Sequence, residues 1–344
     1  MLGATGAVGQ TFIRLLVDHP WFDVAELAAS ERSAGQTYET VTKWLDGAMP
    51  AHVRAHTVLP CDPSQVQAPI VFSALDSSVA GEVEAAFARA GRLVFSNAKN
   101  YRMDPTVPLL IPEVNPDQLG LLARQRQVHH WRGAILTNAN CAATIAAVAL
   151  APIHEAFGIR QLFLATMQAV SGAGYPGVAS LDILGNAIPY IADEEPKIEA
   201  ELGKLLGQTI DGAVVEAPIR ASAHANRVAV EHGHTVCASI GCAERVDVEA
   251  AIRAIDEWAG DAHVAGLPSA GRALVRTEAP NRPQPRRDVQ AGGGMTVTVG
   301  RVRADSVLDL KLVAMGHNVV RGAAGGSILN AELTLARGIR PDAT

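Results

Sequence analysis

Apolar and polar residues alternate along the chain in a pattern that predicts strands and helices in turn. Short apolar runs typical of buried strands lie at residues 24–29, 69–75, 93–95, 134–137, 161–168, 226–230, 295–302 and 308–315. Helical spacing of apolar residues follows the first glycine segment, recurs at 82–90, 142–153 and 249–258, and returns in a closing helix that runs through Leu335. Strands that alternate with helices predict a parallel sheet, whose ligands bind beyond the carboxyl ends of its strands.

The chain opens with a glycine-rich segment, GATGAVG at residues 3–9, which runs directly into the amphipathic spacing Phe12, Leu15 and Leu16. Backbone N–H groups at such a turn can approach a pyrophosphate at a helix start, although a lone glycine triplet also suits a plain tight turn. Only Met1 and Leu2 precede it, whereas a doubly wound sheet needs a central strand there. We therefore expect a first strand that is truncated, in a shortened chain or an incomplete sheet.

Cys141 lies between two of these predicted elements, at the junction of the strand at 134–137 and an Ala-rich helix. We expect this helix to span residues 142–153 and Pro152 to help terminate it. Unpaired N–H groups and the positive end of the helix dipole favour a thiolate at such a junction, and the thiolate is the reactive form of cysteine. Cys141 is thus a candidate nucleophile, with a small buried core residue as the alternative.

Composition and charge narrow the class of partner. The chain has 344 residues, enough for two domains, and its 48% hydrophobic and 19% charged residues are typical of a globular protein. A net charge of −6 without a basic block argues against nucleic acid or an anionic membrane as the main partner. Small molecules are therefore the expected ligands.

The cysteines and the hydropathy of the chain bear on its location. Cys61, Cys141, Cys237 and Cys242 form no CxxC pair and no signal-peptide pattern is present, so we expect reduced cysteines and a cytoplasmic protein. The segment 133–153 lacks formal charges, but its asparagines, threonines and proline fit a strand followed by a helix better than a membrane span.

The tip of the second predicted strand bears on the cofactor. A carboxylate there would bind a ribose 2′-hydroxyl, whereas Ser30, Arg32 and Ser33 suit a 2′-phosphate. Glu31 keeps the first possibility open, because its carboxylate can accept from the hydroxyl. We favour NADP over NAD on this basis.

Three later segments are open to plain structural interpretations. Residues 170–177 are rich in glycine and contain a proline, which suits a structural turn as well as a site loop. His224, His232 and His234 are close in sequence, yet no cysteine or carboxylate pattern completes a zinc site, so we predict no bound metal. The acidic run at 193–201 predicts a helix with Pro196 at its first position.

Taken together, these segments resemble the aspartate-β-semialdehyde dehydrogenases, and more closely their archaeal and fungal branch. The resemblance covers essentially the whole chain in order. The segments that carry it are GATGAVG (3–9), SERSAG (30–35), FSALDSS (72–78), SNAKNYRMD (96–104), NANC (138–141), SGAGYPG (171–177), EEPK (194–197), GHT (233–235) and HNVVRGAAGG (317–326). Residues 185, 229 and 231–232 depart from the family pattern, which puts local geometry in doubt rather than the reaction.

The resemblance implies the fold and the reaction. The expected fold is α/β, with a Rossmann-type NADP-binding domain at 1–140 that is completed by the C-terminal helix 317–344, and an α+β catalytic and dimerisation domain at 141–316. The implied reaction is the reversible, NADP-dependent reductive dephosphorylation of aspartyl phosphate to the semialdehyde through a cysteine thioester. A homodimer or homotetramer is the implied assembly, with no nucleic-acid or membrane partner.

The resemblance also implies the roles of individual side chains. Cys141 is the implied nucleophile and His234 the acid/base, since an ordinary histidine pKa near ~6.5 suits proton transfer, while Gln168 helps hold the acyl group. The implied substrate-binding residues are Arg227 for the carboxylate, Glu195 for the amine, and Arg102 with Lys197 for phosphate. The expected cofactor-binding residues are Gly3, Thr5, Gly6, Ala7, Val8, Gly9, Ser30, Arg32, Ser33, Ser73, Ala74, Ser77, Ser171, Gly172 and Asn318.

Two alternatives remain at this stage. An acyl-CoA reductase on the same scaffold, acting for example on malonyl-CoA, would use the same thiolate, histidine and nucleotide loop. Its phosphate and amine sites would differ, and the presence of Glu195, Arg102 and Lys197 favours the amino-acid phosphate. The short first strand keeps a second alternative open, a truncated and non-catalytic relative.

Overall fold

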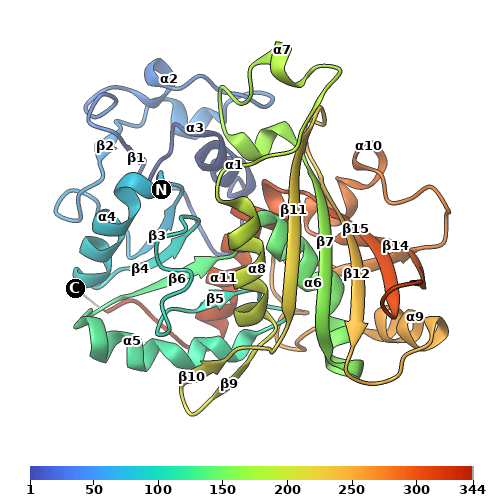
Figure 1. Cartoon of the computed structure of the whole chain (residues 1–344). Coiled ribbons are helices and arrows are strands. Elements are labelled where there is room, and N and C mark those ends of the chain that lie inside the picture. The colour runs from blue at the N-terminus through green and yellow to red at the C-terminus, as the bar shows by residue number, and fades with distance from the viewer. Residues whose placement is uncertain (343–344) are drawn as a thin grey trace.

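The computed structural model describes residues 1–342 and contains two main sheets, one in each half of the molecule (Figure 1). Within these residues, no helix is both long and apolar enough to cross a membrane. The Ala-rich helix α6 (Cys141–Phe157) begins where the last long strand of the first sheet ends, and then packs against the second sheet. The two halves therefore meet at Cys141.

The first sheet is parallel and has the order β3-β4-β6-β5. Its strands are β3 (Ile70–Ser73), β4 (Leu93–Ser96), β6 (Ala134–Asn138) and β5 (Leu109–Leu110), and a separate parallel pair is formed by β1 (Ala28–Ala29) and β2 (Leu59–Pro60). Fully buried Leu2 forms parallel bridges to both Ala28 and Ser73. Its N–H donates to Phe72 O at 2.9 Å, and its carbonyl accepts from Ala74 N at 3.1 Å. The expected first strand is thus reduced to one bridging residue, which joins the two pieces of a Rossmann-type sheet.

Helices flank the first sheet. The longer ones are α1 (Ala7–Leu15), α4 (Ser77–Arg89), α5 (Leu122–His129) and α11 (Gly325–Ala336), and the shorter ones are α2 (Tyr38–Val41), α3 (Ala51–Arg54) and η1 (Pro116–Leu121). Helix α11 packs against β4 and β6, so the C-terminal part of the chain returns to this half as expected (Figure 1). The prediction of a Rossmann-type unit joined to an α+β unit is confirmed.

The second sheet is mixed and has seven strands in the order β13-β14-β15-β12-β7-β11-β8. These are β13 (Leu274–Thr277), β14 (Val297–Ala304), β15 (Leu310–Gly316), β12 (His234–Cys242), β7 (Ile159–Gln168), β11 (Arg220–Val228) and β8 (Ala187–Ile188). Helices α6, α8 (Glu194–Leu205) and α9 (Val248–Glu257) pack on one face. On β7, Leu162 and Leu164 point into this core, whereas Phe163 and Met167 are exposed on the other face. The remaining elements are η2 (Val170–Ala173), α7 (Ser180–Ile183), β9 (Gln208–Ile210), β10 (Ala213–Val215), α10 (Pro285–Asp288), η3 (Ala291–Gly294) and the π-helical turn η4 (Val320–Ala324).

Several predicted boundaries are wrong. Pro152 lies inside α6, which continues to Phe157, because burial of residues 142–153 stabilises the helix despite the lost backbone donor. Helix α8 starts at Glu194, so Pro196 is not its first residue. The strand predicted at 24–29 is limited to β1, and the strand predicted at 226–230 is the end of β11, which stops at Val228.

Candidate active site

Cys141 is the first residue of α6, and Asn140 caps that helix. The Asn140 side-chain oxygen accepts from the N–H groups of Ala142 at 2.9 Å and Ala143 at 3.1 Å. The cap is itself held by two acids, since the Asn140 N–H donates to Glu201 at 2.6 Å and its Nδ2 donates to Glu194 at 2.9 Å. The predicted strand-to-helix junction is confirmed, and its position is fixed by a helix from the other half of the molecule.

The environment of the Cys141 thiol differs from the expectation of a stabilised thiolate. Burial, and to a smaller extent the carboxylate of Glu194, raise its pKa to about 12. The guanidinium groups of Arg102 and Arg227 and the hydrogen bond from the Ala142 amide lower it, but by less. The free protein therefore holds a thiol, and the expectation of a thiolate from the helix terminus alone is wrong.

His234 begins β12 and is fully buried beside this cysteine's helix. Its Nδ1 accepts the Ala169 N–H at 3.0 Å, while its Nε2 is buried without a hydrogen-bond partner among residues 1–342. Burial above all, together with the charges of Arg227 and His317, lowers the pKa of His234 to about 3, so the expectation of an ordinary histidine pKa is wrong. An amide N–H can only donate, so the neutral ring carries its proton on Nε2. His234 is thus built to donate a hydrogen bond from Nε2.

Arg227 and His234 both form a hydrogen bond with the backbone of one residue, Ala169, and both lie against Gly172. Ala169 donates its N–H to His234 and accepts from Arg227 Nη1 through its carbonyl at 2.8 Å. A methyl group at Gly172 would lie 2.8 Å from Arg227 Nη1 and 3.1 Å from His234 Nε2. The glycine loop after β7 therefore covers both side chains and leaves no room for a larger residue.

Sequence reasoning selected Glu195, but the structure places Glu194 at the centre of the site. Glu194 is buried and accepts from Asn140 Nδ2 and from Gln168 Nε2, the latter at 3.1 Å. Glu195 is half-buried and accepts the N–H of Ala225 on β11 at 2.9 Å. The prediction that the helix starts at Pro196 left Glu194 outside it. The correct helix start, at Glu194, would have pointed to this residue.

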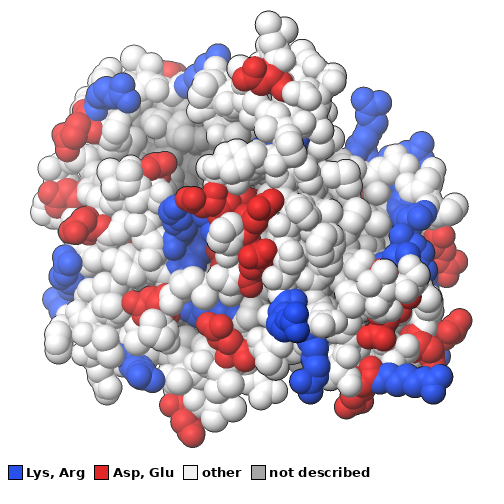
Figure 2. All heavy atoms as spheres, in the orientation of Figure 1, with Lys and Arg blue, Asp and Glu red and all other residues white. Residues whose placement is uncertain are grey.

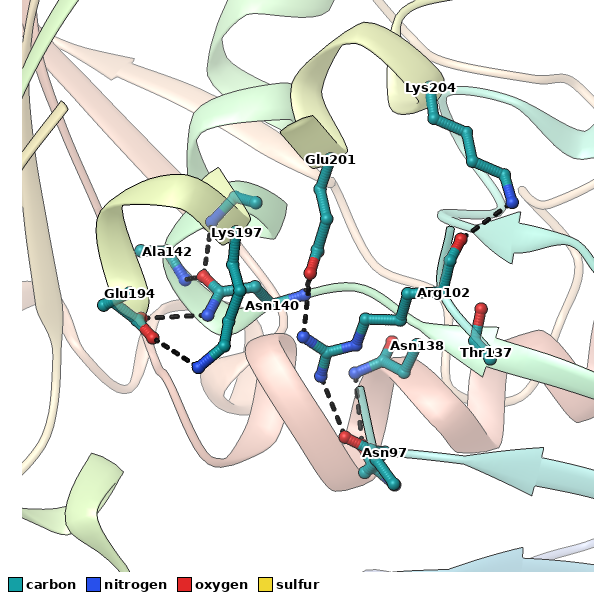
Figure 3. A network of polar contacts seen from close by, with 12 residues as sticks. Asn97, Arg102, Thr137, Asn138, Asn140, Ala142, Glu194, Lys197, Glu201 and Lys204 are labelled. Atoms are coloured by element: carbon teal, nitrogen blue, oxygen red, sulfur yellow. Dashed lines mark hydrogen bonds and ion pairs between the residues drawn. The ribbon is translucent and has the colours of Figure 1, made fainter. Parts of the chain in front are cut away.

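The two basic residues predicted to bind phosphate lie in one polar network, drawn in Figure 3. Arg102 is buried and donates to Glu201 Oε1 at 2.9 Å and to the Asn97 carbonyl at 2.8 Å. Lys197 Nζ lies 3.8 Å from Glu194 Oε2. Lys197 lies on α8 and Arg102 follows β4, so these two basic residues enter the network from opposite halves of the molecule (Figure 3).

The glycine segment at 3–9 has the tight geometry expected of a nucleotide loop. Gly3 has φ +70°, and a methyl group on it would lie 2.6 Å from the Ala74 carbonyl oxygen. A methyl group on Gly9 would lie 2.3 Å from the Gly3 carbonyl oxygen. Gly6 caps α1, so the free N–H groups of Ala7 and Val8 form the helix start. The turn suits a pyrophosphate close to the backbone.

A cavity of about 610 Å³ opens beside this helix start, and Ala7, Ser171, His232 and His317 contribute to its lining. Ser171 Oγ accepts from Asn318 Nδ2 at 2.8 Å and lies 3.0 Å from His232 Nδ1. Figure 2 shows the surface hollowed next to α8, where acidic and basic side chains gather side by side. The cavity joins the predicted nucleotide loop to the glycine loop that covers His234.

The predicted residues at the strand tips divide into two groups. Ser30 and Arg32 are exposed after β1, with Ser33 half-buried, so they are free to meet a ligand. Ser73 is instead fully buried and donates to the Glu84 carboxylate at 2.6 Å. Its hydroxyl therefore points into the fold, and only the backbone at Ser73 and Ala74 faces the loop at Gly3.

Comparisons with known proteins agree with this arrangement. Residues 1–122 match the family model "Semialdehyde dehydrogenase, NAD binding domain", and residues 150–321 match "Semialdehyde dehydrogenase, dimerisation domain". The aspartate-semialdehyde dehydrogenase of Archaeoglobus fulgidus is 47% identical, with 97% of each chain covered, and that of Schizosaccharomyces pombe is 45% identical, with 98% of each covered. The structure of the Candida albicans aspartate-semialdehyde dehydrogenase with NADP matches with a TM-score of 0.90 and 40% identity over 98% of each chain. The chain therefore belongs to the aspartate-semialdehyde dehydrogenase family.

Proposed function

We propose that this chain catalyses the reversible, NADP-dependent reductive dephosphorylation of L-4-aspartyl phosphate to L-aspartate 4-semialdehyde. This reaction belongs to the biosynthesis of lysine, threonine and methionine. The observation that carries the proposal is that Arg227, held with His234 by Ala169, lies near enough to Cys141 at the capped start of α6 to lower its pKa, beside a glycine loop suited to a dinucleotide. The full-length similarity to named dehydrogenases disfavours the acyl-CoA alternative.

The covalent chemistry follows from the positions of Cys141 and His234. Written from the aldehyde side, the Cys141 thiol gives its proton to solvent and the sulfur attacks the carbonyl carbon, so that a C–S bond forms, the carbonyl π bond breaks and its electron pair moves to the oxygen. The Nε2–H of His234 stabilises that oxygen and shares its proton with it. Bound NADP supplies the hydride acceptor. Phosphate then attacks the thioester carbon, the C–S bond breaks, and the Cys141 thiolate leaves.

The substrate charges are matched by side chains around the thiol. The planar guanidinium of Arg227 suits a carboxylate, and Arg102 with Lys197 offers positive charge for phosphate. We infer that Glu194, rather than Glu195, pairs with the substrate amine, because its carboxylate is buried beside Cys141 and Gln168. Gln168 then lies where an amide can hold the acyl group.

The cofactor and the assembly are proposed on related grounds. The loop at 3–9 fits a pyrophosphate, and Ser30, Arg32 and Ser33 suit the 2′-phosphate that distinguishes NADP. We propose the domain division at 140/141, with residues 317–342 returning to the first domain, while the last two residues of the predicted segment, 343–344, lie outside the described residues. The name of the family model over 150–321 and the exposed Phe163 and Met167 support a homodimer or dimer of dimers. Four free cysteines fit a cytoplasmic protein.

Activity measurements test the proposal directly. NADPH formation from aspartate semialdehyde should require inorganic phosphate and should not respond to coenzyme A. Cys141→Ala should abolish turnover, while NADP still raises the melting temperature of the variant. Turnover that depends on coenzyme A and ignores phosphate, or a Cys141→Ala variant with near wild-type activity, would refute the proposal.

A further inference from the structure

The last glycine segment of the chain forms a π-helical turn next to the candidate nucleophile. In this turn, η4, the Gly322 N–H donates to the His317 carbonyl at 3.1 Å, and the Ala324 N–H donates to the Val319 carbonyl at 2.9 Å. π-Helical turns are rare and are frequently found at functional sites. The turn packs against α1, α6 and α11, and therefore sits where the two halves of the molecule meet.

Gly322 places this turn in direct contact with Cys141. A methyl group on Gly322 would lie 2.6 Å from Cys141 Cβ and 2.9 Å from its Cα. Asn138 Nδ2 also donates to the carbonyls of Gly322 at 3.1 Å and Ala323 at 3.3 Å. The backbone of the turn thus packs directly against Cys141 and leaves no space between them for a methyl group.

Arg321, the neighbour of Gly322, anchors the turn through a buried ion pair. Its Nη1 and Nη2 lie 2.6 and 2.8 Å from the two carboxylate oxygens of Glu113. Arg321 is 1% exposed and Glu113 is 5% exposed. Glu113 follows β5, and its backbone carbonyl accepts from Asp261 N at 3.1 Å, which ties the anchor to a third segment. The ion pair therefore attaches the π-helical turn to the rest of the protein in one orientation.

A buried ion pair contributes little to the stability of a protein, because the cost of desolvating its charges offsets most of their attraction. A protein with an apolar pair of similar volume at the same place is often as stable. Its bidentate geometry, in contrast, specifies position and orientation. We propose that Arg321 and Glu113 are positioning residues, which hold the π-helical turn so that Gly322 keeps Cys141 in line with His234. The inference rests on the proposed role of Cys141 as nucleophile.

The paired substitution Arg321→Met with Glu113→Leu tests this, because it removes both charges without leaving one unpaired. We expect kcat to fall at least about tenfold, since small misplacements of reacting groups have large effects on rate. KM for the semialdehyde and the stabilisation by NADP should stay within about twofold of wild type. The pair Arg276→Met with Asp256→Leu is the control, because it removes another bidentate pair, which joins α9 to β13 nearer the surface.

The rate at which iodoacetamide alkylates Cys141 distinguishes a displaced nucleophile from a general loss of structure. A loosened turn admits water to the thiol, so alkylation at neutral pH should become faster while turnover becomes slower. Gly322→Ala tests the same contact without touching the ion pair, and it should lower kcat while NADP still stabilises the protein. Glu113→Asp keeps the charge and should retain more activity than Glu113→Gln.

Wild-type kcat in the folded paired variant, or an equal loss in the Arg276 control, would overturn the inference. If the paired variant does not fold, Gly322→Ala decides, and unchanged kcat in that variant overturns the inference as well. Cys141→Ala is measured in parallel. Activity in Cys141→Ala would refute the proposed function itself, whereas an inactive Cys141→Ala beside fully active Arg321 variants refutes only the positioning role.

Discussion

At the scale of single residues, charged side chains with opposite effects on the pKa of Cys141 surround its sulfur atom. Glu194 raises the pKa of Cys141, whereas Arg102 and Arg227 lower it, and burial outweighs both guanidinium groups. A substrate that brings a positive amine to Glu194 would weaken the charge that disfavours the thiolate. Substrate binding and thiol activation are therefore coupled through one carboxylate.

Glu194→Gln tests this coupling. Loss of the negative charge should lower the pKa of Cys141, so alkylation by iodoacetamide at neutral pH should speed up several-fold. KM for aspartate semialdehyde should rise about tenfold or more, because a charged hydrogen bond to the amine is lost. Glu195→Gln is the matched control and should change neither quantity by more than about twofold. The reverse pattern would return the amine site to Glu195.

His234 gives the protein a specific dependence of stability on pH. Its pKa is about 3 in the folded protein and near ~6.5 in the unfolded chain, so the unfolded state binds more protons between these values. The free energy of unfolding should therefore fall as pH drops below ~6.5, by up to about 1.4 kcal/mol per pH unit from this group.

Urea unfolding of His234→Gln and wild type at pH 7, 6 and 5 measures this term, because glutamine does not titrate. The variant should lose less stability than wild type on acidification. The comparison of the two proteins cancels the contributions of other titrating groups. One of these is Glu84, whose pKa is raised to about 7 by burial and which therefore stabilises the fold as the pH falls, opposite to His234. Parallel curves for the two proteins would contradict the assignment of a buried neutral His234.

At the scale of elements, the start of α6 depends on a helix from another part of the chain. Asn140 caps α6 through its own side-chain oxygen, and α8 supplies Glu194 and Glu201 to hold the cap in place. The start of α6 is held by the cap at Asn140 and by the contact of Cys141 with Gly322, so Cys141 has little freedom to move. This explains how a helix of mostly small apolar residues can present one side chain accurately.

Asn140→Ala should separate the cap from the chemistry. Loss of the capping oxygen should lower the free energy of unfolding by about 1 kcal/mol. Turnover should fall by more than that loss of stability explains, because Glu194 loses one of the two amide donors, Asn140 and Gln168, that hold its carboxylate. Denaturant unfolding and steady-state kinetics on the same preparation give both quantities, and a drop in stability with unchanged kcat would limit Asn140 to a structural role.

At the scale of the whole molecule, a single residue completes the nucleotide-binding sheet. Leu2 bridges Ala28 and Ser73, so the glycine segment that follows begins at the centre of a continuous sheet. The C-terminal segment then brings η4 and α11 back beside Cys141 and the first sheet. The cavity beside Ala7 consequently has walls from both halves, and a bound dinucleotide would stabilise the whole fold.

Thermal shift with NADP measures this link between the cofactor and the fold. NADP at about 100 times its dissociation constant should add about 2.7 kcal/mol to the free energy of unfolding. Gly9→Ala should lose most of this shift, because its methyl group would lie 2.3 Å from the Gly3 carbonyl oxygen. Gly266→Ala is the control, since a methyl group there meets nothing within 4 Å. An equal shift in both variants would contradict the assigned nucleotide loop.

The sequence alone determined most of the longer elements, the order of the motifs and the residue types that the chemistry needs, because apolar periodicity, glycine turns and motif spacing are local properties. It therefore predicted the helix start at Cys141, the loop at 3–9 and the membership of the family. Only the tertiary structure decided which of Glu194 and Glu195 faces the thiol, since one residue along a helix turns a side chain by about 100°. It also decided that burial makes Cys141 a thiol, and that Arg321 meets Glu113 across the interior, because desolvation and distant pairing depend on how the whole chain packs.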